Sequence, residues 1–333
     1  MNNIPDKILS SWERVNKRID DYCDHQREEA FTILFVTDVH IGKPNNFHIN
    51  QLTYLHNLLA MNPCDLIVNG GDIGLDVGED DGEAKRVIEL TKEETAFNYP
   101  YFYIRGNHDY HPSVTNNHEL NLILNQNFIK STDNKKECIV LYETYGGGYG
   151  YFIDSKTDTR AIFLNTSENI RGYDISLKQL DFLVDQLEKA QEANIVLFSH
   201  YCINKCGEWK SYPFNNCSPG IRALIDIEKC FANKEKGSFE NLKWDFQNKK
   251  NQILIHLAGD SHFNNQSNSD GYLIACRQGY GGVELSELPS GASFDAFDKH
   301  ELCNYDILVI KKNKQAKLFR VGAGEKIRDI VIK

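Results

Sequence analysis

The feature that most constrains the fold is a series of short apolar runs that recur along the chain after residue 30. Each run has the length of a strand and a β-branched or aromatic bias, and most end in a polar residue or a glycine. The runs are Phe31–Val36, Leu66–Val68, Tyr101–Ile104, Cys138–Tyr142, Ala161–Leu164, Ile195–Phe198 and Ile253–Leu257. Helical patterns lie between several of them, so the chain is predicted to be an α/β protein.

The predicted helices differ in character. Three alternate with the strands, at about 48–61, 82–95 and 176–191. The last begins with Ser176 and Gln179, which have the spacing of a capping box. A charged amphipathic helix over about 5–29 precedes the first strand, and we expect this N-terminal segment, residues 1–30, to pack on the main domain.

Two later segments interrupt or close the alternation. The stretch at about 202–250 is rich in Asn, Lys and aromatic residues, and we interpret it as an insertion or cap that bears on substrate choice. From Tyr305 onward, the runs YDILVIKK and AKLFRV flank Asn313 and predict a β-hairpin. We therefore expect one domain over residues 31–333 that carries this insertion.

Composition and charge exclude several classes of function. The net charge is -10 and no lysine- or arginine-rich run is present that could track a phosphate backbone, which argues against non-specific binding of nucleic acid. No stretch reaches the roughly 18 apolar residues of a membrane span, and the first residues lack the apolar centre of a signal peptide. The nine cysteines are scattered and odd in number, so most are predicted to be reduced. We expect a cytoplasmic protein with no membrane partner, and its oligomeric state stays open.

Metal-binding types of side chain follow five of the predicted strands. They are Asp38 and His40, Asp72, the Asn107-His108-Asp109 run, His200, and Asp260 with His262. Ligands bind at the carboxyl ends of strands in α/β sheets, so these side chains are expected to meet in one pocket. Oxygen and nitrogen donors without cysteine suit Mn, Fe or Zn rather than a cysteine-based structural zinc site. The sequence therefore predicts a metal centre.

The alternative reading of each element is a plain turn. A single Asp-x-His or Gly-Asp at the end of a strand is more often a turn or cap than a ligand, but five such elements in order make coincidence improbable. The glycine clusters at 145–150 and 279–282 lack the Lys-Ser/Thr signature of a phosphate loop, and we interpret both as turns.

The same residues resemble the successive motifs of the calcineurin-like metallophosphoesterases. The matching motifs are Asp38-x-His40, Gly71-Asp72, Gly106-Asn107-His108-Asp109, His200 and Gly259-x-x-His262. They occur in the family's order across about residues 31–265, and the Gly-Asn-His-Asp motif is the most specific. The resemblance implies a four-layer αββα sandwich, in which two facing mixed β-sheets are flanked by helices and a two-metal site lies at one edge.

Roles for individual residues also follow from the resemblance. Asp38, His40 and His262 would hold the first metal ion, Asn107 and His200 the second, and Asp72 would bridge the two. His108 would contact the phosphoryl group and assist the leaving group, a general-acid role that imidazole suits near neutral pH. The implied cofactor is a pair of divalent ions, Mn, Fe or Zn, with Mn or Fe favoured.

The sequence departs from the family pattern at two positions. Asp260 stands where the family usually has a histidine ligand of the second metal. A carboxylate still binds Mn or Fe and shifts the preference away from Zn, so we predict a retained but altered second site; a weakened or empty site is the alternative. Leu75 stands where some members have an aspartate, and Asp76 or Asp109 is expected to orient His108 instead, which places Asp109 among the predicted catalytic residues.

The expected function is hydrolysis of a small phosphate mono- or diester by a hydroxide that two metal ions activate. The rival hypothesis is a binding or structural protein that kept the fold and lost turnover. The replacement at Asp260 motivates that rival.

Overall fold

The structure is a computed structural model of the chain. It describes residues 4–40, 48–74, 81–94, 99–109, 138–143, 147–168, 173–201, 203, 217–260, 265–267, 273–276, 304–312, 315–322 and 330–332.

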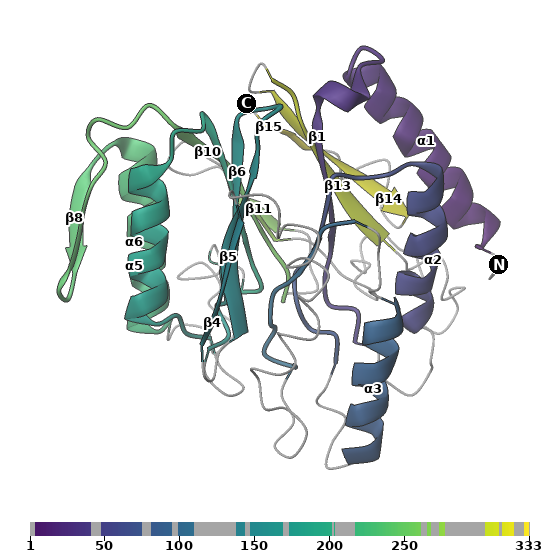
Figure 1. Cartoon of the computed structure of the whole chain (residues 1–333), viewed down its shortest axis with the longest axis horizontal. Helices are drawn as coiled ribbons and strands as arrows, with labels where there is room; N and C mark the ends of the chain where they lie inside the picture. Colours follow the sequence, from purple (N-terminus) through teal and green to yellow (C-terminus); the bar gives the residue numbers. More distant parts are fainter. Residues whose placement is uncertain are drawn as a thin grey trace, which may run out of the picture.

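Two β-sheets face each other at the centre of the molecule (Figure 1). The first contains β1 (Phe31–Val36), β2 (Leu66–Asn69), β3 (Tyr101–Tyr103), β13 (Asn304–Ile310), β14 (Ala316–Gly322) and β15 (Ile330–Ile332), in the order β15-β14-β13-β1-β2-β3. The second contains β4 (Cys138–Glu143), β5 (Gly147–Asp154), β6 (Thr159–Phe163), β7 (Asn194–Ser199), β10 (Gln252–Ala258), β11 (Asn265–Ser267) and β12 (Leu273–Cys276), in the order β11-β12-β10-β7-β6-β5-β4. Both sheets mix parallel and antiparallel pairs.

Strand β1 contributes side chains to two apolar clusters, one between the sheets and one on the outer face of the first sheet. Phe31, Ile33 and Phe35 belong to the apolar cluster between the sheets, whereas Leu34 and Val36 belong to the cluster on the outer face. Successive side chains of a strand point to opposite faces, and both faces of this strand are covered. A continuous apolar run is therefore what a central strand of the sandwich requires.

Helices cover the outer face of each sheet (Figure 1). Those on the first sheet are α1 (Asp6–Tyr22), α2 (His48–Met61) and α3 (Asp81–Glu94), and those on the second are α5 (Leu177–Lys189) and α6 (Pro219–Asn233). A short 3-10 turn, η1 (Arg27–Glu29), leads into β1. The predicted αββα sandwich is confirmed.

The helix ends have local causes. Ser176 caps α5 by accepting a hydrogen bond from the Gln179 amide, as the capping-box spacing predicted. Helix α1 ends at Tyr22 rather than near residue 29, which corrects the predicted range. Asp24 and His25 adopt left-handed backbone angles with φ of 54° and 60°, and such residues end a helix.

The N-terminal helix packs on the first sheet through a stripe at helical spacing. Ile8, Trp12, Val15 and Ile19 are buried in the outer-face cluster. The Ser11 hydroxyl also accepts a hydrogen bond of 2.7 Å from the Gly322 amide at the end of β14. The helix is thus part of the core of the first sheet.

Part of the segment at 202–250 also joins the main core. Helix α6 and the hairpin of β8 (Lys236–Phe239) and β9 (Leu242–Asp245) place Leu224 and Trp244 in the outer-face cluster of the second sheet. Residues 204–216 lie outside the described residues. A role of the segment in substrate choice stays a prediction.

One smaller prediction needs correction, and the cysteines can be compared with theirs. Residues 147–150 begin β5 instead of forming a turn. They pair with β4, and Gly150 also pairs with Phe163 of β6. Residues 279–282 lie outside the described part of the chain. Among the described residues, Cys23, Cys64 and Cys230 are free, whereas Cys217 is disulfide-bonded and departs from the expectation of reduced cysteines.

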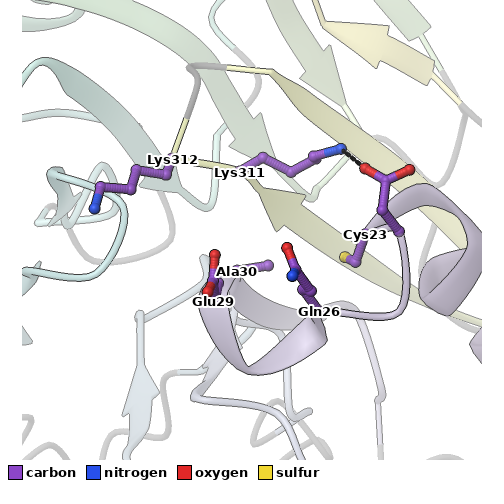
Figure 2. A pocket seen from close by; sticks show the side chains of 7 residues that line it. Cys23, Gln26, Glu29, Ala30, Lys311 and Lys312 are labelled. Carbon is purple, nitrogen blue, oxygen red and sulfur yellow. Dashed lines mark hydrogen bonds and ion pairs between the residues drawn. The ribbon is translucent and has the colours of Figure 1, made fainter.

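A small polar pocket of about 180 Å³ lies at the amino end of β1 (Figure 2). It is lined by Cys23, Asp24, Gln26, Glu29, Ala30, Lys311 and Lys312. Lys311 donates to the Asp24 carboxylate across it. The predicted metal ligands follow the opposite, carboxyl end of β1, so this pocket is separate from them.

Among the described helices, none combines the length and the apolarity that crossing a bilayer requires.

Candidate metal centre

The candidate site is built on unusual backbone at the ends of strands. Asp38, His40, Asp72 and Asp260 all have positive φ, between 47° and 70°. This region is disfavoured for residues with a Cβ atom, and such strain gathers at functional sites. The Asp38 amide donates to the Gly71 carbonyl and the His40 amide to the Asp72 carbonyl, each at 2.9 Å. These bonds hold the loops after β1 and β2 side by side.

The loops bring three of the predicted ligands together. Asp38, Asp72 and His200 are buried, and each offers a ligand atom within 4.8 Å of the others. β1 and β2 are parallel neighbours in the first sheet, while His200 follows β7 in the second. The cluster therefore spans the two sheets.

Nε2 of His200 faces two oxygen atoms. Its Nδ1 donates to the Gly70 carbonyl at 2.8 Å, so the neutral ring carries its lone pair on Nε2. That Nε2 lies 2.9 Å from Oδ1 of Asn107 and 3.3 Å from Oδ1 of Asp72. A cation at this point, either the proton of Nε2 or a metal ion that replaces it, makes the arrangement favourable. Burial lowers the pKa of His200, but Asp72, Asp38 and Asp260 outweigh it and raise this pKa to about 10.

Asp72 lies between the two halves of the site. Its Oδ1 accepts from the His108 amide at 2.9 Å and faces His200, whereas its Oδ2 lies 3.7 Å from Nε2 of His40. Within the described residues, this buried Oδ2 has no hydrogen-bond partner. Burial raises the pKa of Asp72, but the opposite effect of His200, His40 and His108 is larger. The pKa of Asp72 therefore lies well below its usual range. An ionised carboxylate with one free oxygen suits a bridging ligand.

Asp38 and Asp260 are joined through the backbone. The Asp260 amide donates to both oxygens of the Asp38 carboxylate, at 3.0 and 3.1 Å, and the Thr37 hydroxyl donates at 2.7 Å. A Cβ atom on Gly259 would lie 2.0 Å from Oγ1 of Thr37 and 2.6 Å from Oδ2 of Asp38. Glycine is thus required at position 259 for the end of β10 to approach the end of β1.

Asp260, the departure from the family pattern, points into the cluster. Its Oδ1 lies 3.8 Å from Nε2 of His200 and accepts a hydrogen bond of 2.5 Å from the Tyr173 hydroxyl. The Tyr173 ring packs on Tyr201 with centroids 4.2 Å apart. Burial and the Asp260 carboxylate raise the pKa of Tyr173 far above its usual value, so it remains a donor. Sequence analysis missed Tyr173, which belongs to no motif.

The open side of the site carries Asn107 and His108, which are only partly buried. The His108 ring packs edge-on against the His40 ring, with centroids 5.3 Å apart. A partly exposed imidazole next to the buried ligand cluster can reach a bound substrate. The catalytic role of His108 stays a prediction.

Asp109 is buried behind the site. Its carboxylate accepts hydrogen bonds from the amides of Asp72, Gly74 and Gly106 and from the Tyr103 hydroxyl, at 2.7 to 3.2 Å. Burial and the nearby Asp72 raise the pKa of Asp109 to about 6, against the opposite effect of these donors. These contacts hold the loops after β2 and β3 together. Orientation of His108 by Asp109 stays a prediction, and Asp76 lies outside the described residues.

The donor set fits a divalent metal. Carboxylate, imidazole and carboxamide groups suit Mn, Fe or Zn. A cation can replace the proton on Nε2 of His200, and Oδ2 of Asp72 has no hydrogen-bond partner among the described residues. A Cβ atom on Gly106 would lie 2.1 Å from Oδ1 of Asp72, so only glycine lets the backbone pass this close to the Asp72 carboxylate. His262 lies outside the described residues.

Comparisons with known proteins assign the family. The sequence profile described as calcineurin-like phosphoesterase matches residues 31–264, and the chain belongs to this family of phosphoesterases. A dimetal phosphatase from Danio rerio shares the fold with a TM-score of 0.56 at 11% identity, covering 91% of this chain and 98% of that one. GAP50, the anchor in the inner membrane complex of Plasmodium, gives a TM-score of 0.51 at 15% identity, over 91% and 89% of the two chains. No curated protein matches the sequence. At these identities the two structures establish the fold alone.

Proposed function

We propose that the protein hydrolyses a small phosphate mono- or diester with two divalent metal ions held at the carboxyl ends of the strands. The observation that carries this proposal is that Nε2 of His200 lies 2.9 Å from Oδ1 of Asn107 and 3.3 Å from Oδ1 of Asp72 in a buried cluster. Membership of the phosphoesterase family supports the reaction class. When bound, the ions lower the pKa of a water molecule and neutralise charge on the phosphoryl oxygens.

The proposed ligands divide between the two ions. Asp38, His40 and His262 hold the first, Asn107, His200 and Asp260 hold the second, and Asp72 bridges them. The free oxygen of Asp72 toward His40 and its other oxygen toward His200 support the bridging role. Asp260 is included because its carboxylate faces Nε2 of His200. A harder, anionic ligand at this position favours Mn or Fe over Zn.

His108 is proposed to act on the substrate. It stands at the open side of the cluster, and an imidazole there can donate a proton to the oxygen of the departing alcohol. Its amide donates to Asp72, so the proton donor and the bridging ligand are held in one loop. Asp109 is proposed to fix that loop through the backbone amides of Asp72 and Gly106.

The test is hydrolysis of a panel of chromogenic mono- and diesters with added Mn²⁺, with and without a chelator. Turnover that the chelator abolishes and Mn²⁺ restores is the expected result. Turnover that persists after complete metal removal would contradict the proposal. The panel also separates mono- from diester preference.

One observation favours a second candidate, a binding or structural protein with little turnover. Asp260 replaces the usual histidine, and an altered second site can hold metal without supporting the reaction. Bound metal without hydrolysis of any ester, with Mn²⁺, Fe²⁺ or Zn²⁺ supplied, would favour this candidate.

A further inference from the structure

A second chain of polar side chains lies in the second sheet, behind the candidate metal centre. Ser199 ends β7, His256 lies in β10 and Glu228 lies on α6, and all three are fully buried. Oγ of Ser199 is 2.8 Å from Nε2 of His256, whose Nδ1 is 2.9 Å from Oε1 of Glu228. We call Ser199, His256 and Glu228 the buried triad.

The direction of its hydrogen bonds follows from counting protons. The Ser199 hydroxyl has a single proton, and it donates that proton to the Tyr201 carbonyl at 2.9 Å. Ser199 must then accept from His256, so Nε2 of His256 carries a proton. In a Ser-His-acid hydrolase, by contrast, Nε2 takes the proton of the serine. The wrong polarity and the complete burial exclude a nucleophilic role for the buried triad.

The buried triad acts on the segment that carries His200. The bond from Ser199 to the Tyr201 carbonyl spans the intervening His200 and closes a tight turn. The His200 carbonyl accepts from the Gly259 amide at 3.0 Å, and the Tyr201 amide donates to Oγ1 of Thr166 at 2.9 Å. Hydrogen bonds therefore hold the backbone at His200 and at both neighbouring residues.

We propose that Ser199, His256 and Glu228 are positioning residues that hold His200 at the metal centre. Glu228 fixes the His256 ring, the ring donates to Ser199, and Ser199 fixes the turn that aims Nε2 of His200 at Asp72 and Asn107. The metal-binding part of this inference rests on the function proposed above. Stability alone is a weak explanation, because buried acid–base pairs are often no better than apolar residues of the same volume.

The experiment compares four variants by Mn²⁺ titration calorimetry and by thermal unfolding. Ser199→Ala and Glu228→Ala break the buried triad at its two ends, and Glu228→Gln keeps a hydrogen-bonding group of the same shape. Thr159→Val is the matched control. Thr159 is also fully buried in the second sheet and bonds through its hydroxyl to Thr157, but it lies at the opposite end of the parallel strands β6 and β7.

Ser199→Ala and Glu228→Ala are expected to weaken Mn²⁺ binding by about tenfold or more, the usual cost of losing support behind a metal ligand. Glu228→Gln should recover most of the affinity, and Thr159→Val should lower the unfolding temperature without changing the affinity. Ser199→Ala carries the test if Glu228→Ala does not fold. Wild-type affinity in Ser199→Ala, with a thermal loss like that of Thr159→Val, would overturn the inference. Absence of Mn²⁺ binding by the wild type would instead overturn the proposed function.

Discussion

The two sheets contribute to the candidate site in different ways. The first sheet supplies Asp38, Asp72 and the Asn107–Asp109 run from three neighbouring parallel strands, and backbone amides hold these loops together. The second sheet supplies His200 and Asp260. Tyr173 donates to the Asp260 carboxylate, and His256 contacts Ser199, the residue before His200. Both halves carry family motifs, but the side chains that support the second half, Tyr173, His256 and Glu228, belong to no local pattern. We call the residues from the first sheet the first half of the site and those from the second sheet the second half. The two halves should respond differently to substitution.

The largest effect is expected where the halves meet. Asp72→Ala removes the carboxylate that faces both His40 and His200, so metal binding and hydrolysis should fall to the level of chelator-treated wild type. Metal content per chain and turnover measure this. Asp65→Asn, a change at the amino end of β2, is the control and should retain both. Full metal content in Asp72→Ala would remove Asp72 from the ligand set.

A smaller loss is expected from His108 on the open side of the first half. His108→Ala should lower turnover by about 10²- to 10⁴-fold, the usual range for a general acid, while the metal content stays that of wild type. Steady-state kinetics and elemental analysis separate the two readouts. Unchanged turnover would remove the assignment.

Asp260 tests whether the second half binds its own ion. Asp260→Ala should lower the metal content from about two ions per chain toward one, because a carboxylate that faces Nε2 of His200 is lost. Asp260→His should bind Zn²⁺ better relative to Mn²⁺ than the wild type does. If the alanine variant keeps the wild-type content, Asp260 is only a turn residue.

Asp109 tests how far the first half depends on its backbone contacts. Asp109→Asn replaces a buried acceptor of four hydrogen bonds and should lower the free energy of unfolding by roughly 1–3 kcal/mol. Tyr103→Phe removes one of these donors and should cost less. Denaturant titrations of the two variants measure the difference, and equal stability of Asp109→Asn and wild type would disprove this contribution.

The smallest effect is expected at Tyr173. Tyr173→Phe removes the hydrogen bond to Asp260 and should weaken Mn²⁺ binding only a few-fold. The same change in an Asp260→Ala background should have no effect, because the partner is already absent. Calorimetry of the four proteins gives the coupling. An equal loss in both backgrounds would show that Tyr173 acts independently of Asp260.

The sequence was sufficient for the fold and for the proximity of three candidate ligands from the two sheets. Apolar runs such as Phe31–Val36 match observed strands, because a central strand covered on both faces must be apolar throughout. The proximity of Asp38, Asp72 and His200 was predictable from their positions after strands and from the family motifs. Their roles as ligands stay proposals.

Other features had no local signal. Tyr173 lies 87 residues from Asp260, and Glu228 lies 28 from His256, so only tertiary packing brings each pair together. The end of α1 was also missed, because the left-handed residues Asp24 and His25 continue a polar pattern compatible with a helix. Periodicity reports which face is buried and does not report which buried polar groups meet.

If the site binds metal ions as proposed, the convergence of donors from opposing sheets would link metal occupancy to folding. Unfolding separates the carboxylates of one sheet from the imidazole of the other, so an ion that needs both binds only the native chain. Each tenfold excess of free metal over its dissociation constant then adds about 1.4 kcal/mol to the free energy of unfolding. The ions would act as a cross-link between the two sheets, at the edge of the sandwich where the apolar interior ends and charged side chains begin.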